Sequence, residues 1–220
     1  MNYGELKQTV ADWLARADLT ADLPTCVTFA EARINRELSK VGAGELTSTA
    51  LATVSGTETV DLPSDFNGAR MVAVTNGSGT YPMQYMPPEE LLSRYSSTEG
   101  GTPSAFTIIG SDGAGGVQRL MLRQVPNAVL TLTLVYYKSV PTLVGGADGG
   151  TNWFLTKNPD AMTYAVLLEA AGRVASVNDV SLWQAGLQQA FNDIKEQDRA
   201  SRWSGSALRV GNSSALARGC

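Results

Sequence analysis

The sequence predicts an α+β fold, because segments with helical periodicity at both ends of the chain flank a middle with strand periodicity. Apolar residues recur at steps of three and four in residues 3–17 and 25–41, and again after residue 158. Between about 45 and 145, short segments alternate apolar and polar side chains around Gly-rich turns. We therefore expect four main helices packed as a bundle, an inserted antiparallel β-rich lobe and an extended C-terminal tail.

The first expected part is an N-terminal helical pair over residues 1–44. Leu6 and Val10 lie on one face of the first helix, and Ile34 and Leu38 on one face of the second. A proline, Pro24, fits the first turn of the second helix, whose end is set by the Gly-Ala-Gly run that follows it.

The β-rich lobe is expected over residues 45–150. Its clearest strand spans residues 130–137, where leucine occupies every second position from Leu130 to Leu134. Residues 69–86 and 106–125 each predict a hairpin around a Gly-rich turn, and a short helix begins at the two prolines before Glu89.

A C-terminal helical pair, residues 151–203, completes the predicted bundle, and residues 204–220 form an extended arm. The last helix places Trp183, Leu187 and Phe191 on one face. Its partner helix is expected to begin at Asn158, whose side chain would cap the first turn ahead of Pro159.

Composition excludes several kinds of active site. The 220-residue chain has no histidine, so neither a Ser-His-Asp triad nor a His-ligated zinc site can form. The two cysteines, Cys26 and Cys220, have neither disulfide-framework nor metal-site spacing. Net charge is −4, which argues against general nucleic-acid binding. We expect no catalytic residue, cofactor, metal, signal peptide or membrane span.

Two groups of residues superficially resemble catalytic motifs. The Gly-rich runs at 110–116 and 145–150 lack the Gly-Lys-Ser/Thr sequence of a phosphate-binding loop, so we interpret them as structural loops. Glu89 and Glu90 are adjacent on the short helix, where their side chains diverge by about 100°. Their place in its first turn is explained by the helix dipole alone.

Two charged segments are candidates for contacts with partners. Arg33, Arg36 and Lys40 share one face of the second helix and could bind an acidic partner, a neighbouring subunit or passing nucleic acid. A solvated face balanced by Glu31 and Glu37 is the alternative. After Asp198 the chain contains arginines but no acidic residue. This tail is either an arm that orders on a partner or an ordinary frayed terminus.

An ordered set of segments resembles the head–tail adaptor (connector) proteins of tailed bacteriophages. The segments are TFAEARINRELSKV, LPSDFNGARMVAV, YPMQYMPPEELLSRY, LVYYKSVPTL and TNWFLTKNPDAMTYAVLLEAA. The resemblance covers roughly residues 1–200 and includes the helix-strand-helix layout.

The resemblance implies a non-enzymatic virion protein, assembled in the host cytoplasm, that lies in the neck between capsid and tail. Such adaptors form a ring, usually of twelve copies, under the portal protein. They join the portal to a downstream tail or nozzle protein and continue the channel through which DNA passes without sequence-specific binding. A terminal extension often reaches the portal.

These roles select candidate residues. Contacts between neighbouring copies are expected at Arg33, Arg36, Lys40, Trp153, Asp193, Glu196 and Asp198. A portal-binding arm is expected to use Arg202, Leu208, Arg209, Val210, Leu216 and Arg218.

Two alternatives belong to other classes of protein. A tail-associated ligand- or glycan-binding module would use exposed aromatic residues of the β lobe, namely Tyr81, Tyr85, Tyr136 and Tyr137. A hydrolase with a His-free site would depend on a carboxylate such as Glu89 or Asp65.

Overall fold

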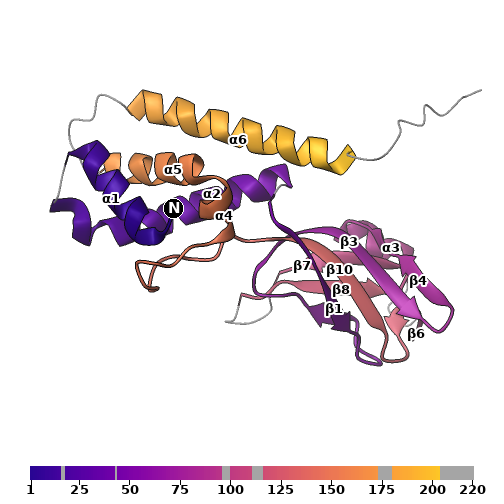
Figure 1. The fold of residues 1–220 in the computed structure, drawn as a ribbon. Coiled ribbons are helices and arrows are strands. Elements are labelled where there is room, and N and C mark those ends of the chain that lie inside the picture. Colours follow the sequence, from indigo (N-terminus) through magenta and orange to yellow (C-terminus); the bar gives the residue numbers. More distant parts are fainter. Residues whose placement is uncertain (16–17, 43, 96–99, 111–115, 173–179, 204–220) are drawn as a thin grey trace, which may run out of the picture.

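The computed structural model describes residues 1–15, 18–42, 44–95, 100–110, 116–172 and 180–203. It consists of a helical part and a β lobe joined side by side (Figure 1). The helices are α1 (Tyr3–Leu14), α2 (Leu23–Val41), α3 (Pro88–Arg94), α4 (Trp153–Lys157), α5 (Pro159–Ala171) and α6 (Val180–Trp203), with a 3-10 turn at Asp18–Ala21.

The N-terminal helices have clear start and stop signals. Asn2 caps α1, because its Oδ1 accepts a hydrogen bond from the Glu5 backbone N–H at 2.8 Å while Glu5 bonds back to the Asn2 N–H. Helix α1 ends at Leu14, earlier than expected, where Ala15 adopts a left-handed conformation with φ 48°. Helix α2 ends at Gly42, whose φ of 60° suits glycine, as predicted.

Helix α5 is the centre of the helical part. It packs on α2, α6 and α1 and is buried nearly all round (Figure 1). Met162 and Val166 of α5 meet Ile34 of α2 and Phe191 of α6 in one apolar core. The four main helices therefore pack together, as the sequence predicted.

The β lobe consists of two facing sheets and a small strand pair. The strands are β1 (Leu46–Ala52), β2 (Thr59–Asp61), β3 (Phe66–Asn76), β4 (Gly79–Pro82), β5 (Gln84–Tyr85), β6 (Gly100–Gly101), β7 (Ala105–Ile109), β8 (Arg119–Arg123), β9 (Val125–Pro126) and β10 (Thr131–Lys138). One sheet has the order β1-β10-β3-β4 and the other β2-β8-β7-β5, with β6 paired to β9.

The two larger sheets share an apolar core. Leu132 and Leu134 of β10 and Val72 of β3 meet Phe106 and Leu120 of the other sheet. Most pairings are antiparallel, as expected, but β5–β7 and β6–β9 are parallel. The fold is α+β, and α3 covers a small cluster that contains Met86 and Leu91.

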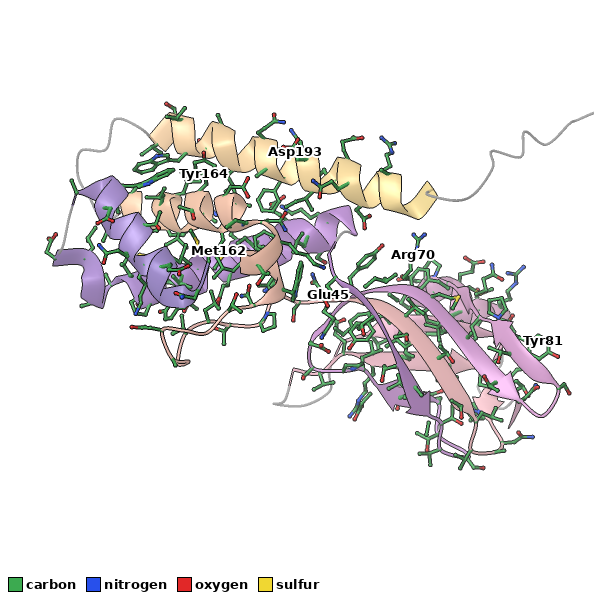
Figure 2. The ribbon with its side chains drawn as sticks, viewed as in Figure 1. Glu45, Arg70, Tyr81, Met162, Tyr164 and Asp193 are labelled. Carbon is green, nitrogen blue, oxygen red and sulfur yellow. The ribbon has the colours of Figure 1, made fainter. Side chains whose placement is uncertain are left out.

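The helical part and the β lobe are joined by hydrogen bonds at a narrow junction near Glu45 (Figure 2). The Glu45 carbonyl accepts from the Lys138 N–H at 2.9 Å. This bond joins the segment that enters the β lobe to the segment that leaves it. Asn67 of β3 donates to the Asn35 carbonyl of α2 at 3.4 Å, and Ser39 donates to the Asn67 carbonyl at 3.3 Å. Helix α2 is thus bonded directly to the β lobe.

The segment between β10 and α4 is bound along the helical part. Asn35 Oδ1 accepts from the Val140 N–H at 2.7 Å, and Glu31 accepts from the Leu143 N–H at 2.7 Å. Farther on, Asp148 forms an ion pair with Lys7 at 2.6 Å. The long Gly-rich loop is therefore held against the helices by these contacts, which agrees with its interpretation as a structural loop.

The start of the C-terminal pair differs from the prediction at one residue. Asn158 precedes Pro159 at the first position of α5, but its side chain makes no capping hydrogen bond. The capping side chain belongs to Asn152, whose Oδ1 accepts from the Leu155 N–H at 2.8 Å and starts the separate short helix α4. The prediction that the Asn158 side chain caps α5 is wrong. Asn158 directly follows the last residue of α4, and its backbone connects the two helices with φ −133° and ψ 64°.

Candidate interaction surfaces

The three cations expected on one face of α2 have different surroundings. Arg33 forms an ion pair with Glu169 of α5 at 2.7 Å, and Lys40 forms one with Glu37 at 2.6 Å. Within the described parts of the chain, Arg36 has no such partner. The solvated alternative therefore accounts for Lys40 with Glu37, whereas Glu31 is buried and lies outside the stripe.

A groove lies between this face of α2 and helix α6. Its volume is about 330 Å³, and it is lined by Arg33, Arg36, Glu37, Leu168, Gln184, Leu187, Gln188, Phe191 and Lys195. Leu168, Leu187 and Phe191 make part of the lining apolar, while Arg36 and Lys195 add positive charge from the two walls. The groove can hold an anionic side chain that brings a short apolar stem.

Asp193 and Glu196 lie on the side of α6 that faces away from the groove, whereas Asp198 does not. Asp193, labelled in Figure 2, lies five residues after Gln188 and thus about 140° around the helix from that groove residue. It accepts a hydrogen bond from Gln189 at 2.9 Å, and Glu196 lies 3.8 Å from Arg199. Asp193 and Glu196 are exposed on the flank and outer face of α6, away from α2.

Trp153 and Asp198 lie together at the junction instead. They line a cavity of about 450 Å³ with Gly44, Lys157, Asn158, Ile194 and Gln197. The Trp153 indole N–H donates to the Ser139 carbonyl at 3.2 Å, and its ring packs edge-on against Phe154. Trp153 therefore anchors α4 to the end of β10, and only part of it is accessible to a neighbour.

Except for Arg202, the residues of the predicted portal-binding arm fall outside the described residues. Arg202 is in the last turn of α6, but its side chain is not described. Leu208, Arg209, Val210, Leu216 and Arg218 lie beyond residue 203.

The aromatic groove of the glycan-binding alternative does not form as expected. Tyr136 and Tyr137 are buried at 5% and 6% exposure, whereas Tyr81 and Tyr85 are exposed at 47% and 56%. The Tyr136 hydroxyl donates to Asp65 at 2.9 Å, and burial together with this bond raises the pKa of Tyr136 to about 12. Two of the four proposed ligand-stacking residues are core residues.

Of the two carboxylates of the hydrolase alternative, Asp65 has structural partners. Asp65 accepts from Tyr136 and lies 3.8 Å from Lys138, and its carbonyl accepts from the Ser139 N–H at 2.7 Å. Glu89 is exposed in the first turn of α3, next to Glu90, which lies 3.6 Å from Arg94. In the described ranges, no cluster of three or more acidic or cysteine side chains could hold a metal ion.

Two buried charged groups were not predicted from the sequence. Burial raises the pKa of the Glu31 carboxyl above its usual value near 4.5, while hydrogen bonds from Leu143 and Thr142 oppose that rise. Arg123 is 2% exposed and pairs with Glu58 inside the β lobe. No local pattern distinguishes these residues from surface charges, because their burial depends on loops far away in the sequence.

Charged helix flanks and a partly apolar groove thus leave the helical part available for contacts with other chains, as in proteins that act by binding other proteins. The family comparison agrees with that class: residues 1–211 match the model of the SU10 adaptor protein family, and the chain belongs to this family. It is thus a phage adaptor, a structural component of the virion, as the resemblance implied. No curated protein matches the chain significantly. Within the described residues, no helix is both long and apolar enough to span a membrane.

Proposed function

We propose that copies of this chain form a ring, of twelve subunits, that joins the portal protein to the downstream tail or nozzle protein. The ring continues the channel through which DNA leaves the capsid, without catalysis and without sequence-specific DNA contacts. Support comes first from membership of the adaptor family. The net charge of −4 also suits a channel wall that does not retain DNA.

The observation that carries the ring is the pair of oppositely charged flanks on the helical part. A closed ring requires two different, complementary surfaces on each subunit. Arg36 and Lys195 add positive charge from the two walls of the α2–α6 groove, and Asp193 and Glu196 add negative charge on the far side of α6. We propose that the acidic flank of one copy docks at the basic groove of the next, with Arg33 and Lys40 exchanging partners there.

The remaining candidate residues have roles at the ends of the ring. Trp153 and Asp198 line the junction cavity, which a neighbouring copy would cover. The arm after Trp203 is proposed to reach the portal, where its arginines suit an acidic surface and its isolated apolar residues provide anchors.

Charge reversal tests the proposed subunit contact. Arg36→Glu and Asp193→Lys should each weaken ring formation on the portal by about fivefold, or about 1 kcal/mol per contact. The double variant should recover most of this loss, since the opposite charges meet again. Arg70→Glu, an exposed reversal on β3, is the matched control and should leave ring formation unchanged. If the double variant lost as much ring formation as the single variants, the pairing of Arg36 with Asp193 would be rejected.

A further inference from the structure

Strand β1 forms an unprotected edge of the β lobe. It lies at one end of the order β1-β10-β3-β4, and among the described residues no strand pairs with its other side. Figure 1 shows β1 along one margin of the lobe, with β3 and β10 between it and β4. A free strand edge presents unpaired backbone N–H and C=O groups and tends to recruit another strand.

The other sheet edges are blunted in ways that β1 is not. Strand β4 is four residues long and ends in Pro82, which cannot donate a hydrogen bond. Strand β2 spans three residues and ends in the charged Asp61, and β5 spans two. Strand β1, Leu46–Ala52, is seven residues long, without proline or charge, and its register with β10 is unbroken. The lobe leaves one edge open to pairing.

The alternation of hydrogen bonds along β1 identifies the residues whose backbone groups point away from β10. The Lys138 N–H donates to the Glu45 carbonyl and the Thr53 N–H donates to the Leu130 carbonyl, both at 2.9 Å, at the two ends of the register. In an antiparallel pair, hydrogen-bonded residues alternate with residues whose backbone groups point away. The outward groups therefore belong to Leu46, Ser48, Ala50 and Ala52, whose side chains are exposed.

A segment of the chain beyond residue 203 fits this edge. Residues 206–210, Ser-Ala-Leu-Arg-Val, place Leu208 and Val210 two residues apart, the spacing of one strand face. On β1 the half-buried Leu51 packs against the core of the lobe, so an added strand could extend that apolar row with Leu208 and Val210. Arg209 would then face solvent with Ser48 and Ala50.

We propose that residues 206–210 of one copy add as a strand to the β1 edge of a neighbouring copy. The segment lies inside the range that matches the adaptor family, which ends at residue 211, whereas Leu216 and Arg218 lie beyond it. On this proposal Leu208, Arg209 and Val210, assigned above to portal binding, link copies within the ring instead, and Leu216 and Arg218 remain for the portal. The inference rests on the proposed ring and refines the role of its arm.

The reach of the chain constrains this contact. Residue 206 follows Trp203, the last residue of α6, by three positions. Three extended residues span roughly 10 Å. The acceptor must therefore be a copy whose β lobe lies beside the C-terminal end of α6, as a side-by-side ring would place it.

Cysteine cross-linking in rings assembled on the portal tests the strand addition. Cys220 is first changed to Ser, and the remaining Cys26 is buried at 1% exposure. Ser48→Cys and Arg209→Cys are then combined in one chain and treated with a short bis-maleimide. We expect a ladder of covalent multimers. A cross-link within single chains, or no cross-link, would overturn the proposal, as would dimers from Ser48→Cys alone, which indicate β1–β1 pairing.

A backbone variant provides the second arm of the test. Ala50→Pro removes an outward N–H and no hydrogen bond to β10, so the lobe should fold while the ladder is lost. Ala50→Thr, which keeps the N–H, should retain the ladder. If rings form on the portal in every variant with no ladder, the strand inference fails alone. If no rings form in the parent protein, the proposed function fails.

Discussion

At the scale of single residues, Asn152 connects three segments of the chain. Its side chain accepts from Leu155 at 2.8 Å to cap α4 and donates to the Pro141 carbonyl at 2.8 Å, and it is 8% exposed. Both bonds are buried or partly buried, where an unpaired polar group is costly. Asn152 is therefore the residue that fixes the direction of the chain as it returns from the β lobe to the helices.

Asn152→Ala should lower the free energy of unfolding by about 1–2 kcal/mol, since it removes a helix cap and leaves the Pro141 carbonyl without its donor. Asn158→Ala is the matched control, because the Asn158 side chain makes no capping bond, and it should cost less than about 0.5 kcal/mol. Urea unfolding followed by circular dichroism measures both. A larger loss in the Asn158 variant would reverse this assignment.

Glu31 should give the protein a pH-dependent stability. Because burial raises its pKa, the folded protein binds this proton more tightly than the unfolded chain does, so the stabilising contribution of Glu31 is fully present below the usual value near 4.5. The contribution of Glu31 to stability is then lost as the pH rises through its raised folded-state pKa.

Urea unfolding of the parent protein and of Glu31→Gln at several pH values between 4 and 8 measures this effect. The Gln variant should lose less stability than the parent as the pH rises, since its amide stays neutral and can still accept from Leu143. Parallel pH profiles would show that the carboxyl does not titrate across this range.

At the scale of elements, the packing of α6 on α5 depends on a glycine. A Cβ at Gly186 would lie 2.9 Å from the ring of Tyr164, which is closer than side chains pack. Tyr164 in turn meets Trp13 of α1 edge-on, with ring centroids 6.1 Å apart. Gly186 thus lets three helices approach one another at this end of the bundle.

Gly186→Ala should destabilise the protein by about 1–3 kcal/mol, although alanine favours a helix by up to about 1 kcal/mol. Ser181→Ala, an exposed change in the first turn of the same helix, should be nearly neutral. Thermal unfolding compares the two. A stabilised Gly186→Ala protein would mean that α6 moves away from Tyr164 without loss.

The sequence was sufficient to predict elements whose period is regular. The stripes of α2 and α6 and the alternation in β10 each identify one buried face, so the helical bundle and the sheet strands follow from local pattern. The parallel pairings of β5 and β6 were missed, because each spans two residues and carries no periodicity. The sequence predicted a cap at Asn158 instead of Asn152, because the helix Trp153–Lys157 is too short to show a periodic pattern.

The candidate surfaces were predictable only as helix faces. The sequence placed Arg33, Arg36 and Lys40 on one side of α2, but it could not show that Glu169 of α5 pairs with Arg33. Nor could it place Lys195 opposite Arg36 across a groove, because that depends on how α6 crosses the bundle. Burial of Tyr136 and Tyr137 likewise depends on the second sheet and the junction, which no local pattern reports.

At the scale of the whole molecule, the helical part and the β lobe each provide one of the two proposed contacts between copies. The helical part carries the oppositely charged flanks, and the β lobe carries the open edge of β1. Hydrogen bonds from α2 to β3 and from Trp153 to the end of β10 join the lobes, so a contact made by one lobe positions the other. A ring built from such subunits would be held at two separate places on each copy.

The proposed contacts all depend on the assembly of copies of this chain into a ring on the portal. Negative-stain imaging of the protein alone, and mixed with the portal protein of the same virion, tests it most directly. We expect single or weakly associated subunits in the first sample and rings seated on portals in the second. Single subunits that ignore the portal in the mixed sample would contradict it.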